Sequence, residues 1–149
     1  MKMNEYFFAI SGTFLWIGFV CAISFMEAWL KFRAPGITRP LGLGIGRLVF
    51  KALNKVEWFF AFVLVVCYFL FDRKMLPIGS IFYFVPLFLL ILQTIWLLPA
   101  LDTRAELHIK GIPVPRSNLH FYYVGIELFK VVCLICSGIM LFKQLEAGC

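Results

Sequence analysis

The residues best suited to chemistry are charged and polar side chains that lie inside apolar stretches. In the segment RLVFKALNKVE, Arg47 and Asn54 share one helical face, and Glu57 follows one turn later. Glu127 and Lys130, three residues apart in the last apolar stretch, lie on one face of another helix and can form an ion pair. Such charges are costly in an apolar setting unless they are paired or hydrated. Together they could bind a small polar molecule or an ion, or exchange protons.

Two further candidates lie at the same level of the expected helices. Glu27 shares a helical face with Thr13, Trp16 and Ser24, and His120 opens the last apolar stretch. Histidine titrates near neutral pH, so it could exchange a proton there. We therefore predict one ligand-binding site formed by Glu27, Arg47, Asn54, Glu57, His120 and Glu127. The sequence identifies no catalytic residue, predicts no metal site and leaves any cofactor unknown.

The elements that carry these residues are predicted from the apolar composition. Of 149 residues, 62% are hydrophobic and 15% are charged, whereas soluble domains are nearer half apolar. A bilayer is crossed by roughly 20 mostly apolar residues, a length that the second stretch reaches only by extending upstream through RLVFKALNKVE. We predict an all-α integral membrane four-helix bundle that forms a single transmembrane domain over residues 1–149. Its helices are expected at about residues 6–32, 46–71, 77–100 and 118–143.

The placement of basic residues predicts the orientation of the bundle. The connections after the first and third helices carry Lys31, Arg33, Arg39, Arg47, Lys51, Lys55, Arg104, Lys110 and Arg116. The opposite side carries Lys2, Arg73, Lys74 and Lys143. The positive-inside bias puts the first group in the cytoplasm and both termini on the non-cytoplasmic side. We expect a multi-pass protein of the bacterial inner membrane, with the candidate site in its cytoplasmic half.

The net charge of +6 bears on the expected partners. Basic side chains next to a membrane span attract anionic lipid headgroups, so the bilayer is the first expected partner. A soluble basic face is not predicted, and we therefore expect no nucleic-acid partner. A small-molecule ligand and a homo-oligomer are further expected partners.

The connection after the first helix reads RAPGITRPLGLGIG, and its Pro and Gly content predicts a loop or re-entrant turn. The glycine spacing in GLGIG differs from that of the common phosphate-binding fingerprints, and no strand precedes it. We expect a loop at the membrane surface, with the second helix beginning near Gly46.

Several motifs occur in a fixed order along the chain: WIG, FMEAWLKFRAPG, GRLVFKALNKVE, WLLPALD and RSNLH. In this order the chain resembles, over nearly its full length, a family of small membrane proteins with a domain of unknown function. That family includes the transmembrane protein linked to cisplatin resistance. It is distantly similar to copper-resistance and haem-biosynthesis membrane proteins, so the resemblance implies haem or metal handling as one alternative. Only His108 and His120 could supply imidazole ligands.

The segment RLVFKALNKVE also resembles the R-x6-N-x2-E segment of the membrane-associated eicosanoid and glutathione metabolism proteins. Arg47, Asn54 and Glu57 match that frame, whereas Phe50 and Ala52 stand where the family has further basic and histidine positions. Those proteins are small four-helix chains, usually trimers, that hold glutathione at the cytoplasmic side. The resemblance implies a glutathione- or lipid-acting membrane transferase or isomerase as a second alternative.

The leading functional hypothesis is a polar pocket at the cytoplasmic side that binds or passes a small molecule or ion. The sequence leaves open whether the protein is an enzyme. A purely structural use of the same side chains is also open, because Arg47 and Lys51 could lie among lipid headgroups. Asn54 and Glu57 could then tie neighbouring helices together by hydrogen bonds.

Overall fold

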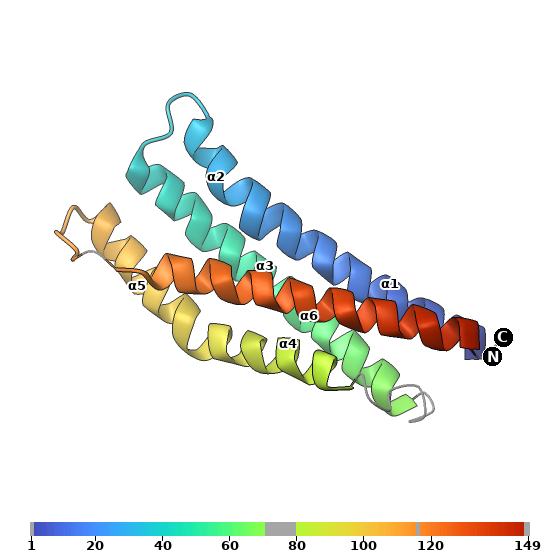
Figure 1. Cartoon of the computed structure of the whole chain (residues 1–149). Helices are drawn as coiled ribbons and strands as arrows, with labels where there is room; N and C mark the ends of the chain where they lie inside the picture. Colours follow the sequence, from blue (N-terminus) through green and yellow to red (C-terminus); the bar gives the residue numbers. More distant parts are fainter. Residues whose placement is uncertain (1, 71–79, 116, 148–149) are drawn as a thin grey trace.

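A computed structural model describes residues 2–70, 80–115 and 117–147, and all regular structure in these residues is helical (Figure 1). The first segment comprises α1 (Lys2–Val20), the π-helical turn η1 (Cys21–Glu27), α2 (Ala28–Leu30) and the 3-10 turn η2 (Lys31–Arg33). The second is α3 (Arg39–Leu70). The third comprises α4 (Ser80–Leu92), the π-helical turn η4 (Gln93–Leu97) and α5 (Leu98–Ile109), and the fourth is α6 (Leu119–Ala147). The predicted all-α architecture of four helices is confirmed.

The two chain ends lie together at one end of the bundle, and the connections from η2 to α3 and from α5 to α6 lie at the other (Figure 1). Helix α6 packs against α1 and α4, and α3 packs against α1 and α5. Side chains from four helices meet in the apolar core: Trp16, Val20, Phe60, Ala61, Leu90, Val131 and Leu134. The same four segments, including their turns η2 and η4 and helix α5, also supply the polar side chains described below.

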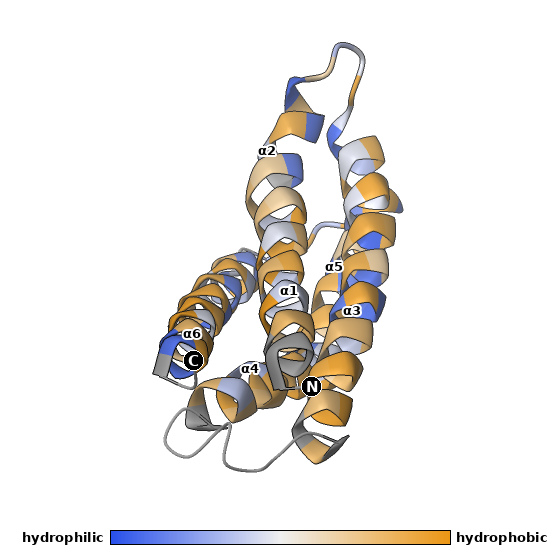
Figure 2. Ribbon diagram, turned by 90° about the vertical axis from the view of Figure 1, so that its right-hand side faces the viewer, coloured by the Kyte–Doolittle hydropathy of each residue, from blue (hydrophilic) through white to orange (hydrophobic). Residues whose placement is uncertain are grey.

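Three of the four segments are long and apolar enough to cross a membrane, namely Phe7–Arg33, Phe82–Ile109 and Leu119–Glu146. Apolar residues cover most of the helix lengths in Figure 2, and large side chains such as Ile95 and Phe121 are exposed. Helix α3 carries several charges in its first half and is not one of these three segments. The expected end of the second helix at 71 and the expected start of the third at 77 lie outside the described residues. The crossing of the membrane by α3 therefore stays a prediction.

The connection after the first segment is shorter than predicted, because α3 begins at Arg39 rather than near residue 46. The Ile37 N–H donates to the Ala34 carbonyl at 3.2 Å, and Gly36 inside this turn has a φ of 80°, which favours glycine. Pro40 lies in the first turn of α3, where its missing N–H costs no helical hydrogen bond. The predicted loop conformation of GLGIG is therefore wrong, since these residues are helical.

The third segment also runs further than predicted, because it ends at Ile109 rather than near residue 100. Pro99 lies in the first turn of α5, directly after the π-helical turn η4, so it starts a new helix instead of ending the segment. The segment changes direction between α4 and α5 (Figure 1). At its end, Gly111 has a φ of 72° and the Ile112 N–H donates to the Leu107 carbonyl at 3.0 Å, a glycine-terminated helix end.

Candidate functional site

A cavity of about 120 Å³ lies between η2, α3, α5 and the start of α6, at the end of the bundle opposite the termini. Its volume is near the ~150 Å³ of an apolar cavity that holds benzene and below the roughly 300–1,000 Å³ of pockets for drug-sized ligands. The polar part of its wall is formed by Lys31, Arg47, Lys51, Asp102 and His120. The apolar part is formed by Phe32, Leu43, Phe50, Leu98, Leu101 and Ala105. We call this cavity the basic pocket.

Two glycines of α3 allow η2 to lie against this pocket. A Cβ atom at Gly42 would clash with the ring of Phe32. A Cβ atom at Gly46 would lie 3.0 Å from Nζ of Lys31, which is closer than ordinary van der Waals contact. The glycines of GLGIG therefore serve the close approach of two helical segments.

Asp102 of α5 joins two basic side chains of α3. Arg47 donates from Nε to Oδ1 at 2.6 Å and from Nη2 to Oδ2 at 3.0 Å, the two-point geometry of an arginine–carboxylate pair. Lys51 Nζ lies 3.0 Å from Oδ1 of the same carboxylate. The Lys51 side chain is 53% exposed, so its ion pair contributes about 1 kcal/mol or less. Arg47 thus lies in the pocket wall, where its charge already has a partner.

Lys31 is the most enclosed cation of the basic pocket, with 9% of its side chain exposed. Its Nζ donates to Oε2 of Glu27 at 3.2 Å and lies 5.2 Å from the ring centre of Phe50. Glu27 does not line the pocket itself and acts on it through Lys31. His120 lines the pocket from the first turn of α6.

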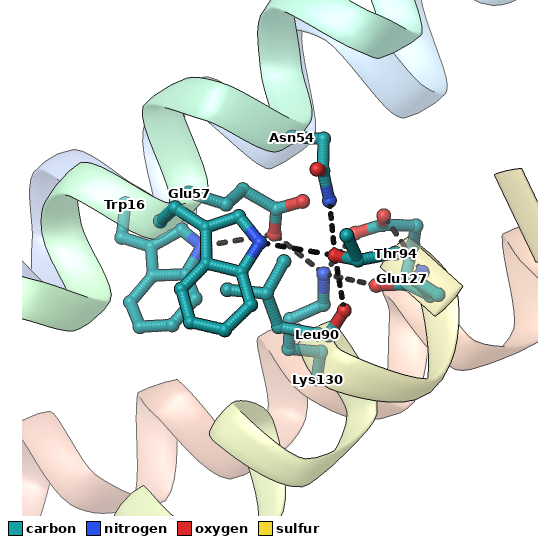
Figure 3. Close-up of polar contacts among 9 residues, drawn as sticks. Trp16, Asn54, Glu57, Leu90, Thr94, Glu127 and Lys130 are labelled. Atoms are coloured by element: carbon teal, nitrogen blue, oxygen red, sulfur yellow. Dashed lines mark hydrogen bonds and ion pairs between the residues drawn. The ribbon is translucent and has the colours of Figure 1, made fainter. Parts of the chain in front are cut away.

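Asn54 makes a separate link between α3 and η4. Its Nδ2 donates to Oγ1 of Thr94 at 2.9 Å, and Nε1 of Trp58 donates to the same oxygen at 3.0 Å (Figure 3). The Thr94 hydroxyl in turn donates to the Leu90 carbonyl at 2.7 Å. Asn54 therefore ties two helices together, as the structural alternative predicted, and it does not line the basic pocket.

A second group of polar side chains lies in the interior of the bundle, and we call it the buried cluster: Trp16, Glu57, Gln93, Glu127 and Lys130. Glu57 Oε1 accepts from Trp16 Nε1 at 3.0 Å and from Lys130 Nζ at 2.5 Å (Figure 3). Lys130 Nζ also donates to Gln93 Oε1 at 2.6 Å and lies 3.2 Å from Glu127 Oε2. Gln93 Nε2 donates to Glu127 Oε1 at 2.9 Å. The cluster thus joins α1, α3, η4 and α6.

All five side chains of the buried cluster are at most 2% exposed. A buried charge needs an opposite charge or hydrogen-bond partners, because the loss of its hydration otherwise costs on the order of several kcal/mol per ion. The ring of Tyr123 is buried beside the cluster and lies 5.0 Å, centre to centre, from the ring of Phe50. Since Phe50 lines the basic pocket, an aromatic pair lies between the pocket and the cluster.

The structure distributes the six predicted site residues over three places. Arg47 and His120 line the basic pocket, and Glu27 contacts its wall through Lys31. Glu57 and Glu127 both contact Lys130 in the buried cluster, whereas Asn54 donates a hydrogen bond to Thr94 outside it. The three residues that match the glutathione-binding frame therefore do not converge on one cavity.

Several residues of these sites were not among the predicted six. Lys31 and Asp102 lie in the pocket wall, and Gln93 and Trp16 complete the buried cluster. A polar amide in the middle of an apolar stretch, as at Gln93, is the one available signal, because it needs a hydrogen-bond partner inside a membrane. The predicted Glu127–Lys130 ion pair is present at 3.2 Å.

Within residues 2–70, 80–115 and 117–147, no three His, Cys, Asp or Glu side chains are grouped so that they could hold a metal ion. Cys133 and Cys136, one turn apart on α6, are free thiols.

Comparison with known proteins adds no relative. The chain matches no family model, no curated protein and no solved structure, so both resemblances described above stay predictions.

Proposed function

We propose that the protein is a multi-pass membrane protein whose four helices all cross the bilayer, with both termini on the non-cytoplasmic side. The basic side chains support this orientation, because those of η2, the first half of α3 and α5 gather at the end opposite the termini. The many exposed large apolar side chains support the membrane setting, and apolar residues make up most of the helix lengths in Figure 2. In this orientation the basic pocket opens at the cytoplasmic side.

We further propose that the basic pocket binds a small molecule through an acidic group. The observation that carries this proposal is the set of three cations in the wall, Lys31, Arg47 and Lys51, beside one lining carboxylate, Asp102. Two further carboxylates, Glu27 and Glu106, pair with Lys31 and Arg47 from outside the lining. An ammonium has three donors, and among the described residues Lys31 uses one of them on Glu27. Two N–H donors of Lys31 are thus left for an acidic group in the pocket that this side chain lines.

The size and the apolar part of the wall narrow the class of ligand. A cavity of about 120 Å³ holds a small organic acid or the acidic headgroup of a lipid, with carbon atoms against Phe32, Phe50 and Leu101. Glutathione is closer to the drug-sized ligands that occupy several times this volume. A small organic acid and an acidic lipid headgroup would both be recognised through a phosphate or carboxylate group.

Calorimetry on detergent-purified protein tests the proposal, with inorganic phosphate, acetate and glutathione as soluble probes. For a lipid headgroup, the Tm of the protein is compared between nanodiscs of anionic phosphatidylglycerol and nanodiscs of neutral phosphatidylcholine. A bound headgroup raises Tm, because a ligand that binds only the folded protein stabilises it. We expect phosphate, acetate or the anionic lipid to bind, and glutathione and the neutral lipid not to bind. Preferential binding of glutathione would favour the transferase alternative.

A matched pair of variants locates the binding. Lys51 lines the basic pocket, whereas Lys55, one helical turn later, is exposed and does not. Lys51→Gln removes one partly exposed cation and should weaken binding of the acidic probe by about fivefold. Lys55→Gln removes the same charge outside the pocket and should leave binding unchanged. Equal effects of the two substitutions would show that the probe does not occupy the basic pocket.

A further inference from the structure

The buried cluster holds more acidic than basic groups. Glu57 and Glu127 each bring a carboxyl group, Lys130 brings one amine, and all three are at most 1% exposed. Trp16 and Gln93, the other members, carry no charge. If every group were ionised, the cluster would keep one uncompensated negative charge away from water.

The oxygen atoms around Lys130 indicate that its amine is charged. Oε1 of Glu57, Oε1 of Gln93 and Oε2 of Glu127 surround Nζ at 2.5, 2.6 and 3.2 Å. An ammonium has no lone pair, so it suits three surrounding oxygens, two of which accept a hydrogen bond from it, whereas a neutral amine would bring a lone pair against one of them. The charge that needs balancing is therefore on the carboxyl groups.

The two carboxyl groups are bonded differently. Glu57 Oε1 accepts from both Trp16 and Lys130, an arrangement that stabilises an ionised carboxylate. Glu127 accepts from Gln93 at Oε1, but its fully buried Oε2 has no hydrogen-bond partner in the described part of the chain. A proton can be added at this oxygen without removing a hydrogen bond, so Glu57 and Glu127 can share one proton between them.

Within the described ranges, the elements packed against the cluster bring no positive charge that could replace that proton. The groups that face the cluster are Trp16 of α1, Gln93 of η4, and Tyr123 of α6, which interacts with Glu127 and with Ser24 of η1. None of these side chains is a cation. A proton taken up from solvent can supply the missing positive charge.

We propose that the buried cluster is a proton-binding site in which Glu57 and Glu127 share one proton while one of the two carboxyl groups remains ionised against Lys130. Binding converts one carboxylate and one solvent proton into one carboxylic acid, so the cluster becomes neutral. The proposal concerns the interior of the bundle and does not depend on the ligand of the basic pocket.

Infrared spectroscopy of the purified full-length protein tests this directly, in a detergent without ester or carboxyl groups. At about pH 7 exposed carboxyl groups are ionised, so a carbonyl band of a protonated carboxylic acid that shifts on exchange into heavy water reports a buried proton. We expect this band in the wild-type protein. Its absence would overturn the proposal without any variant being needed.

Single substitutions then test the charge balance. Glu127→Gln and Glu57→Gln each leave a single carboxyl group in the cluster, which must then ionise against Lys130. Both variants should lose the band, whereas Glu146→Gln, at an exposed position of the same helix, should keep it. A band that survives either cluster substitution would show that the proton is held elsewhere, and it would overturn the proposal.

Discussion

Replacing Lys130 by methionine removes the only cation of the buried cluster and keeps the length and apolar volume of the side chain. Glu57 then keeps a hydrogen bond from Trp16 alone, and Glu127 keeps one from Gln93. The Oε1 atom of Gln93 loses the donor that now lies 2.6 Å away. The substitution therefore leaves the ionised carboxylate of the cluster without a counter-charge.

The size of the effect follows from this burial. Glu57 and Glu127 are 1% and 0% exposed, so the lost ion pairs are not replaced by water. Breaking a buried pair by removing one partner costs about 3–5 kcal/mol. For a chain of this length such a loss lowers Tm by about 10 °C. The folded variant should also bind more protons than the unfolded chain, so its stability should fall further as the pH rises.

Thermal unfolding in detergent, followed by tryptophan fluorescence, measures this loss. Lys143→Met, at an exposed position of the same helix, is the matched control and should change Tm by only a few degrees, a rough expectation for a surface site. Combining Lys130→Met with Glu57→Gln and Glu127→Gln makes the cluster neutral and should recover part of the lost stability. A Tm for Lys130→Met equal to that of Lys143→Met would refute the inference that the cluster depends on a buried ammonium.

Two further predictions concern helix contacts. Thr94→Val removes the hydroxyl that accepts from Asn54, and it should cost about 1 kcal/mol in unfolding free energy, since hydrogen bonds between membrane helices are modest; an unchanged free energy would show that this link is not made. Gly42→Ala places a methyl group against Phe32 and should destabilise by about 1 kcal/mol, whereas Gly18→Ala enters open space and should be neutral or stabilising. Equal thermal shifts of the two alanine variants would contradict the close approach of η2 to α3.

Much of the helical architecture could be predicted from local patterns, and the errors occur where tertiary contacts decide. Long apolar stretches predict helices whatever their neighbours are, and three of the four segments have the length and apolarity of membrane spans. The start of α3 was missed because Pro and Gly usually indicate a loop. In the structure Pro40 lies in the first turn of the helix, and Gly42 and Gly46 give room to Phe32 and Lys31.

For the candidate site, too, contacts within one helix could be predicted, whereas contacts between helices could not. Helical periodicity predicted the ion pair between Glu127 and Lys130, because both residues lie on one helix. Asn54 and Glu57 are one turn apart on α3, yet the first bonds to Thr94 and the second to Lys130. Which partner each meets depends on the rotation of α3 against its neighbours, and a single sequence contains no measure of that rotation.

The central proposal is that the basic pocket holds an acidic group at the cytoplasmic end of a membrane bundle. An experimental structure of the protein, purified from its own membrane without added ligand, tests this most directly. We expect density for a phosphate or carboxylate group within hydrogen-bond distance of Lys31 and Lys51, with carbon atoms against Phe50. A pocket that holds only water, or a neutral or cationic molecule, would contradict it.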